Sequence, residues 1–518
     1  MQILQARIKV AGGRIQKIEP QYGGVTIVNE RDQINHFRDA WVMPGLVESH
    51  AHLHGLGQRL LGLKLYDCAG AEECVQRAAD HIADGEWLQG MGWNQEKWPG
   101  GKLPTRAVLD DAFPDRPVVM RRADGHAVWV NSQALQRAGI TNDTPDPAGG
   151  RILRDDKRQV TGVLVDNAMD LVLKHIPPTS PEQTRRHIES AAAEYAKLGV
   201  TEVHDMDVHP RLLDHFRELA ERGNLAVRVQ SHISGQNNEW LHERLLPAGG
   251  EFLRVYAIKL YADGALGSRG AHLLQPYADD ATTRGLEMLS AADLRSKIRN
   301  ILEYGWNVSV HAIGDAANRN VIDAYEVMRR ERIADEQTIL RIEHAQIVTP
   351  RDQERIGTIG IIPAVQASHC VSDAPMARLR LGEERCRYAY PWRSLRNNGA
   401  LLAGGSDAPI ESPDPLIGID AFCRRIPFGE EESWNAQECI TREEALLAYT
   451  EWAHTAADMD YRRGKLKEKF DADFVVVDRN LLTCKDEEIK GTKVLGTWSG
   501  GVRRWVDETR VENQPPGE

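Results

Sequence analysis

The chain has 518 residues, of which 42% are hydrophobic and 27% charged, which is typical of a globular protein with more than one domain. It contains no run of about 18 apolar residues, and this excludes a protein whose helices cross a bilayer. Acidic residues outnumber basic ones by 76 to 64, and the net charge of −12 disfavours nucleic acid as a partner.

The first forty residues predict a small β layer. Residues 3–9, 14–18 and 25–29 read as short alternating strands, and Gly-Gly pairs between them indicate turns. The opening MQILQARIKVAGGRI lacks the basic segment followed by an apolar segment that marks a secretory signal. We therefore expect the mature chain to begin at or near Met1.

Apolar strand-like runs then alternate with helical segments, which is the pattern of a (β/α)8 barrel of about 250 residues. The predicted barrel strands are residues 42–50, 200–205, 225–232, 254–261, 306–311, 339–344, 359–366 and 400–407. The predicted helices include residues 182–198, 210–222, 291–304, 315–332 and 441–453. We assign residues 43–59 and 182–461 to this α/β barrel.

A long insertion separates the first two predicted barrel strands. Residues 60–181 are rich in Trp, Gly and Pro, and they contain the strand-like segments VVMRRA and VWVNS. We predict that they form a small α+β cap subdomain over the mouth of the barrel.

The C-terminal end repeats the texture of the first forty residues. Residues 473–478, 493–498 and 502–506 are again short strands. Three strands at each end are more stable as one sheet system than as two separate ones. We predict a discontinuous β-sandwich domain of residues 1–42 and 462–512, followed by a disordered tail at 513–518.

The cysteines predict a reducing compartment. The chain has seven, widely scattered and without a Cys-x-x-Cys pair, which argues against a disulfide framework or a structural zinc knot. Together with the missing secretory signal, this leads us to expect a cytoplasmic protein that contacts no membrane.

Several metal-ligating side chains fall at the ends of predicted strands. His50 and His52 are two residues apart on the first strand, so their side chains project to the same face. In a chain with 18 histidines, an incidental pair at this spacing is about as probable as a metal-binding pair. Four more candidates end other strands: Lys259, His311, His344 and Asp407. Because the C-terminal ends of barrel strands converge on one face, we predict a single metal site there.

The residue types favour an open catalytic centre. Neutral imidazoles and a carboxylate bind zinc, iron or manganese, and no cysteine is among the candidates. The ammonium group of Lys259 is a poor ligand, but a buried neutral amine reacts with carbon dioxide to give a carbamate whose oxygens could bridge two metals. The alternative is an ordinary lysine that pairs with Asp263.

Motifs along almost the whole chain resemble the amidohydrolase superfamily, specifically the YtcJ-like branch of amidohydrolase family 3. They are MPGLVESHAHL, LQGMGWNQEKWP, LPTRAVLDDAFPDRPVVMRRADGHAVWVNSQAL, GVTEVHDM, KLYADGALGSR, VHAIGDAAN, RIEHAQIV, GGSDAPIESPDPL and EEALLAYT. So many motifs in the same order are specific for the family but not for a substrate.

The resemblance implies a barrel beside a β-sandwich, one or two divalent ions per subunit with zinc expected first, hydrolysis of C–N or related bonds, and a homodimer. It implies that one metal is held by His50, His52 and Asp407, that a second is held by His311 and His344, and that Lys259 bridges them. The segment VQASHCVSD departs from the family, whose members often have proline two residues before the histidine, so the role of His369 stays open.

We therefore predict a metal-dependent hydrolase that cleaves an amide or cyclic amide of a small molecule, with Asp407, His344 and Lys259 as the catalytic group. A metal lowers the pKa of its bound water toward about 7 and polarises the carbonyl. Asp407 would take the proton from the water and give it to the departing amine, or else only cap the turn that follows it. An N-deformylase, a hydrolytic deaminase and a non-catalytic binding relative stay as alternatives.

The predicted substrate-binding residues are His126, Trp93, Asp263, Arg269 and His369. His126 could instead be a packed structural histidine, and Trp93 could fill the core of the cap rather than form an aromatic wall. Asp263 and Arg269 lie in a Gly-containing loop after the fourth strand, which could line the pocket or be a plain turn.

Overall fold

The computed structural model describes residues 2–514 apart from residues 32, 82–84, 124 and 148. The chain divides into two compact units, one of residues 1–56 and 191–518 and the other of residues 57–190. The helices α1 (Leu53–Leu61) and α6 (Pro181–Lys197) carry the chain from one unit to the other. Within the described residues, no helix has both the length and the apolar character needed to cross a membrane.

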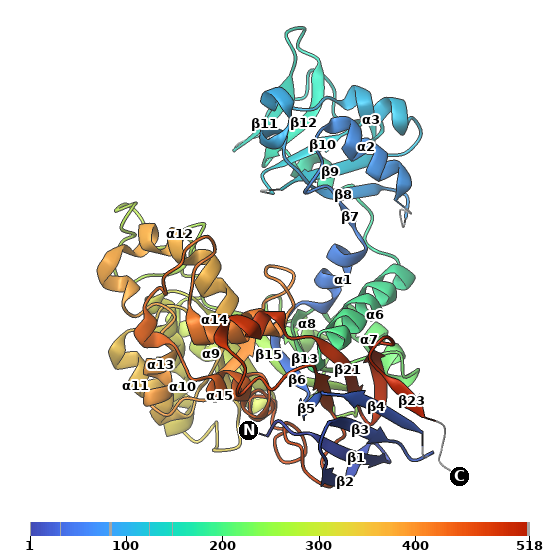
Figure 1. The fold of residues 1–518 in the computed structure, drawn as a ribbon. Coiled ribbons are helices and arrows are strands. Elements are labelled where there is room, and N and C mark those ends of the chain that lie inside the picture. The colour runs from blue at the N-terminus through green and yellow to red at the C-terminus, as the bar shows by residue number, and fades with distance from the viewer. Residues whose placement is uncertain (1, 32, 82–84, 124, 148, 515–518) are drawn as a thin grey trace. The chain divides into compact units, whose positions relative to one another are not determined.

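Eight parallel strands form the barrel of the first unit (Figure 1). In order around the sheet they are β6 (Leu46–Ala51), β13 (Val200–Val208), β14 (Arg228–Ser234), β15 (Leu253–Tyr261), β16 (Asn307–Ala312), β17 (Leu340–His344), β18 (Ile362–Gln366) and β19 (Ala403–Gly405). The barrel closes just beyond β19, where the Asp407 N–H donates to His50 O at 2.7 Å and the His52 N–H donates to Ala408 O at 2.8 Å. The predicted barrel is therefore confirmed.

The first predicted barrel strand, residues 42–50, is in fact two strands. The segment β5 (Trp41–Pro44) belongs to another sheet, and β6 begins after Pro44 and Gly45. Proline has no N–H to donate to a neighbouring strand, so a change of sheet at this point loses no hydrogen bond.

Helices follow the barrel strands as expected. They are α7 (Leu213–Glu221), α8 (Glu239–His242), α9 (Ala291–Glu303), α10 (Asp315–Arg330), α11 (Pro350–Ile359), α12 (Ala367–Cys386), α13 (Trp392–Asn397), α14 (Pro415–Arg424), α15 (Arg442–Ala448) and α16 (Glu451–Thr455). The predicted helix 441–453 is divided between α15 and α16, which are separated at Tyr449 and Thr450.

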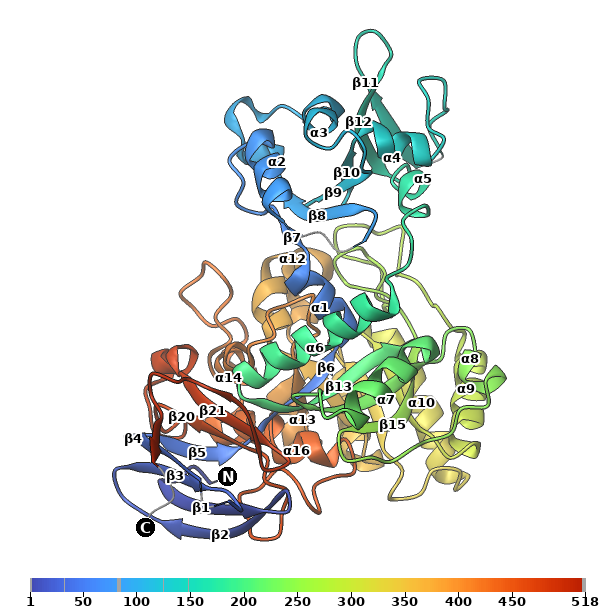
Figure 2. The same ribbon diagram turned by 90° about the vertical axis from the view of Figure 1, so that its right-hand side faces the viewer.

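Both ends of the chain build the β-sandwich, as predicted. In Figure 2 the blue N-terminal strands lie beside the red C-terminal strands. One sheet has the order β2 (Arg14–Pro20), β1 (Ala6–Ala11), β3 (Gly24–Val28), β4 (Ile34–Arg38) and β23 (Glu512–Gln514), and the other has the order β22 (Val502–Val506), β21 (Val494–Ser499), β20 (Phe474–Val477) and β5. Trp498 lies between the sheets, stacked on Phe474 with ring centroids 5.3 Å apart and edge-on to Phe37 at 6.0 Å.

The predicted disordered tail at 513–518 begins too early. Residues 512–514 form β23, which pairs with β4 in an antiparallel register. The edge of this sheet offers unpaired N–H and C=O groups that a terminal segment can satisfy. Residues 515–518 lie outside the described residues.

The second unit has its own sheet and core. The sheet has the order β11 (Gly150–Arg154), β12 (Val160–Asp166), β10 (Ala127–Val130), β9 (Val118–Arg122), β8 (Leu88–Trp93) and β7 (Leu63–Lys64), and the helices are α2 (Ala71–Asp80), α3 (Arg106–Ala112), α4 (Ser132–Arg137) and α5 (Asp170–Leu173). Trp93 is fully buried in its core, and its Nε1–H donates to Met120 O at 2.7 Å. This favours the interpretation that Trp93 fills the core over that of an exposed aromatic wall.

Candidate metal centre

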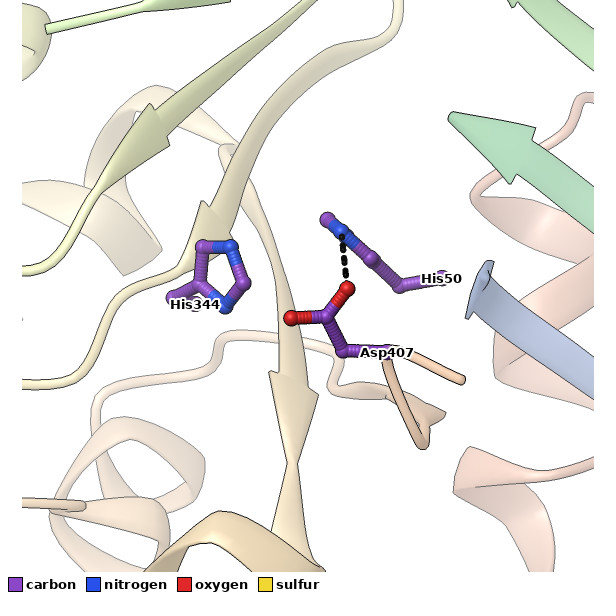
Figure 3. A group of neighbouring side chains, drawn as sticks. All are labelled: His50, His344 and Asp407. Carbon is purple, nitrogen blue, oxygen red and sulfur yellow. Dashed lines mark ion pairs between the residues drawn. The ribbon is translucent and has the colours of Figure 1, made fainter. Parts of the chain in front are cut away.

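Three side chains meet at the C-terminal ends of barrel strands. His50 comes from β6, His344 ends β17, and Asp407 lies just after β19 (Figure 3). One potential ligand atom from each lies within 4.8 Å of the other two, and all three residues are buried. Two imidazoles and a carboxylate at this separation form a donor set suited to a divalent transition metal.

The imidazole tautomers suit a cation. His50 Nδ1 lies 2.6 Å from Glu343 Oε2, His52 Nδ1 3.0 Å from Met206 O, and His344 Nδ1 2.7 Å from Gln366 Oε1. Each of these oxygens is an acceptor, so each Nδ1–H donates, and in the neutral form of each ring the lone pair is on Nε2. The Nε2 atoms of His52 and His50 face the same acid, since Asp407 Oδ1 lies 3.2 Å from the first and 3.6 Å from the second.

The protonation states also suit a cation. Burial lowers the pKa of His50 to about 4, and it holds the pKa of His344 well below the usual range. Burial alone would raise the pKa of Asp407, but the hydrogen bond from His52 and the nearby imidazoles hold it well below its usual value. Neutral His50 and His344 beside an ionised Asp407 are the forms that bind metal. Burial would lower the pKa of His52, but its hydrogen bond to Asp407 raises that pKa, so His52 must release a proton when it binds a cation.

The backbone is strained at this end of the barrel. His344, Ala345 and Asp407 have φ values of 74°, 41° and 60°, in the left-handed region that non-glycine residues rarely adopt. Such conformations cost of order 1–3 kcal/mol each and persist where the surrounding structure fixes them, often at functional sites. Two of the three residues are the proposed ligands themselves.

His311 and Lys259 lie near the C-terminal ends of the neighbouring strands β16 and β15. The rings of His311 and His344 have centroids 4.5 Å apart, and His311 Nε2 is buried, makes no hydrogen bond among the described residues and lies 3.5 Å from Asp263 Oδ1. Lys259 is buried with its Nζ 5.0 Å from the centre of the Tyr261 ring, and burial lowers its pKa. A buried imidazole nitrogen without a hydrogen bond beside the first donor set fits a further metal ligand.

His369 also reaches this group. It lies in the first turn of α12, with its ring stacked on His344 at a centroid distance of 6.0 Å. Its Nε2 lies 3.9 Å from Asp407 Oδ2 and has no hydrogen-bond partner among the described residues. The side chain of His369 therefore lies beside His344 and Asp407, although the residues before it depart from the family pattern.

Asp263 and Arg269 make mainly structural contacts. The buried Asp263 carboxylate accepts backbone N–H groups of His272, Ile313 and Gly314 at 2.8 to 3.0 Å, and it thereby holds together the loops after β15 and β16. Arg269 pairs with Asp279 at 2.9 Å. Substrate binding by either residue stays a prediction.

The remaining candidates, His126 and Trp93, belong to the second unit. His126 is exposed and its Nδ1 lies 2.9 Å from Asp166 Oδ1, so it is not a packed core histidine. Its contact with substrate stays a prediction.

Several ionisable residues that support the centre are absent from the sequence prediction. Glu343 contacts His50, and Arg341 donates to both oxygens of Glu343 at 2.8 and 3.0 Å. Glu48 accepts from the His50 N–H at 2.9 Å and from the Ser406 hydroxyl at 2.6 Å, so it fastens β6 to the segment that carries Asp407. The available signal was the charge of Glu48, Arg341 and Glu343 within otherwise apolar strands, because a buried charge requires a partner.

Comparison with known proteins agrees with this geometry. The model of the Amidohydrolase family matches residues 38–504. The chain is 35% identical to the putative amidohydrolase YtcJ of Bacillus subtilis, over 90% of this chain and 88% of that protein. It is 26% identical to the N-substituted formamide deformylase of Arthrobacter pascens, over 90% and 88% of the two chains. The crystal structure of a metal-dependent hydrolase from Pyrococcus furiosus superposes with a TM-score of 0.76 at 28% identity, covering 93% of this chain and 99% of that one.

Proposed function

Because this chain belongs to the amidohydrolase family, we propose that it is a metal-dependent hydrolase that cleaves a C–N bond, in an amide or cyclic amide, of a small molecule. The observation that carries the proposal is the buried group of His50, His344 and Asp407, with ligand atoms within 4.8 Å of one another. The hydrolase names of the relatives support it.

The proposed ligand roles follow the side-chain placement. His50, His52 and Asp407 would hold one divalent ion, with zinc as the first candidate, and His311 and His344 would hold a second. A divalent ion at this place supplies an acidic water and polarises a carbonyl oxygen. The neutral Nε2 atoms and the ionised carboxylate are the groups that this chain contributes.

Asp407 is the proposed general base and acid. Its carboxylate is ionised, so it can accept a proton from the attacking water and then donate that proton to the departing amine nitrogen. His369 Nε2, 3.9 Å from Asp407 Oδ2, is the proposed group for orienting the substrate carbonyl or this second oxygen. His344 is the remaining proposed catalytic group. As a ligand of the second ion, it would fix the position at which the carbonyl carbon is attacked.

Lys259 is proposed to carry a carbamate. Its neutral amine nitrogen would add to the carbon of carbon dioxide, forming one N–C bond and releasing one proton to solvent. The burial of Lys259 at a strand end supports this, because an ammonium group there lacks solvent and repels cations. Native mass spectrometry of the wild-type protein should show the added mass of one carbon dioxide, and a Lys259→Arg variant should lack it. If the two proteins differ in mass only by the substituted side chain, the carbamate is contradicted.

The substrate is proposed from the same centre and the relatives. The deformylase relative makes N-substituted formamides a second candidate class after N-acyl amides. The decisive experiment is metal analysis followed by assays on N-acyl amines, cyclic amides, N-formyl amines and aminated heterocycles. Turnover of a heterocycle would indicate a deaminase, and bound metal without turnover on any compound would indicate a binding relative.

A further inference from the structure

A buried row of charged and polar side chains leads away from His50. It passes through Glu343, Arg341, His204, Glu202 and Arg463 to Asp471. Asp471 and Asp473 directly precede β20, so the row ends at the β-sandwich. All of these side chains are buried. We refer to Glu343, Arg341, His204, Glu202, Arg463 and Asp471 as the supporting row.

Arg341 is the branch point of the supporting row. It binds both oxygens of Glu343, and its Nη2 also donates to Ser49 O at 2.8 Å, which is the residue before His50. Its Nη1 donates to His204 Nδ1 at 2.8 Å. One planar guanidinium thus fixes both the carboxylate partner of His50 and the backbone next to His50.

The row continues through carboxylates that are shared by two elements. His204 Nε2 lies 3.6 Å from Glu202 Oε1 without a hydrogen bond among the described residues, and Arg463 Nη1 donates to Glu202 Oε2 at 2.7 Å. Arg463 Nε then donates to Asp471 Oδ2 at 2.9 Å. The sequence segment just before the sandwich strand β20 is thereby tied to strand β13 of the barrel.

His50 differs from the other two histidines in the charge of its partner. His344 donates to the neutral amide of Gln366 and His52 to a backbone carbonyl, whereas His50 donates to Glu343. Arg341 Nε and Nη2 donate to the two Glu343 oxygens at 2.8 and 3.0 Å, so a guanidinium charge lies directly beside this carboxylate. An anionic partner strengthens an imidazole as a ligand more than a neutral one does.

Stability alone does not account for this arrangement. A buried row of ion pairs costs desolvation that apolar side chains of similar size would avoid, and apolar replacements are often neutral or stabilising. What apolar side chains cannot do is orient an imidazole and hold its Nδ1 proton.

We infer that Arg341 and Glu343 are positioning residues for His50 as a metal ligand, and that Glu202 and Arg463 extend this support to the β-sandwich. The inference rests on the proposed function, because it requires a cation at His50. It assigns to residues well outside the ligand set an effect on the affinity of the centre for metal.

The test uses the full-length protein and zinc or cobalt(II) ions alone. Glu343→Gln keeps an amide oxygen that can accept the hydrogen bond from His50 Nδ1–H, but it removes the negative charge. Arg341→Lys keeps a positive charge but loses the planar guanidinium that contacts both oxygens of Glu343. We expect each to weaken zinc binding about 10- to 100-fold in competition with a chromophoric chelator and to alter the cobalt absorption bands. The melting temperature of the metal-free proteins reports folding separately.

Asp352→Asn is the matched control. Asp352 is a buried carboxylate at the start of α11 that pairs with Arg319 at 2.9 Å and makes none of the contacts described for the candidate ligands. Its replacement should change stability without changing zinc affinity. Arg463→Lys tests the far end of the row and should weaken zinc binding several-fold.

The outcomes separate the two proposals. A wild-type protein that binds neither ion would overturn the proposed function. Wild-type binding that is matched by Glu343→Gln and Arg341→Lys would overturn only the positioning role, and Arg341→Lys decides if Glu343→Gln does not fold. An unchanged affinity in Arg463→Lys, with loss in the other two, would remove the extension to the sandwich.

Discussion

Replacing Asp407 by Asn removes a charge and a proton acceptor while keeping the shape of the side chain. In the folded chain Asp407 Oδ1 lies 3.2 Å from His52 Nε2 and 3.6 Å from His50 Nε2. An amide oxygen in the same place still faces these nitrogens. We therefore expect most of the metal to stay bound.

The expected loss of rate follows from the two proton transfers assigned to this side chain. A positioned general acid or base contributes about 10²- to 10⁴-fold, and an amide can perform neither transfer. We expect kcat to fall at least about 10³-fold, which corresponds to about 4 kcal/mol of activation free energy. KM should change less, because substrate contacts away from the reacting bond remain.

The assay measures kcat and KM on the best substrate of the panel, with metal content determined on the same preparations. Asp352→Asn again serves as control, since it removes a buried charge at another place in the fold. An Asp407→Asn enzyme that retains its metal and more than a tenth of the wild-type kcat would show that another group is the base.

Three further measurements test other parts of the structure. Removing the metal with a chelator should lower the melting temperature reversibly, because an ion present at about 1,000 times its Kd stabilises the native state by about 4 kcal/mol; no shift in calorimetry would contradict a bound ion. Burial raises the pKa of Glu48 to about 8 from 4.5, so the stability due to its proton is complete below pH 4.5 and is lost as the pH rises through about 8. Glu48→Gln should remove this loss in urea titrations of the metal-free protein, and an identical pH dependence in both proteins would disprove the assignment. Trp498→Ala should destabilise the β-sandwich by about 3–5 kcal/mol in the same titrations, and a change below about 1 kcal/mol would mean that the two sheets do not depend on this ring.

The barrel was predictable from the sequence because its strands are short apolar runs at regular spacing. The helix α12 was not predicted, since Pro375 lies inside it and Gly382 has a φ of 71°. These two residues disguise a helical pattern that tertiary contacts nevertheless maintain. The division between β5 and β6 was not predicted either. Both strands are apolar and follow one another directly, so they look like one strand in the sequence.

The ligand candidates His50, His344 and Asp407 were found from their places at strand ends, and the structure brings them together. His369, predicted as a substrate-binding residue, lies beside them. Their supports were not found, because each depends on a pairing between distant strands. His50 and Glu343 lie 293 residues apart in the sequence, and no local pattern specifies that contact. The substrate-facing role of the second unit, the carbamate and the homodimer stay predictions.

The pairing of β5 with β20 has a consequence for synthesis on the ribosome. Residues 41–44 leave the exit tunnel early, whereas their antiparallel partners at 474–477 are made near the end of translation. At about 5–20 residues per second, the nascent N-terminal strands wait roughly 20–90 s for those partners. During that time their apolar faces are exposed, so a premature stop before β20 should yield a product that aggregates or is captured by chaperones.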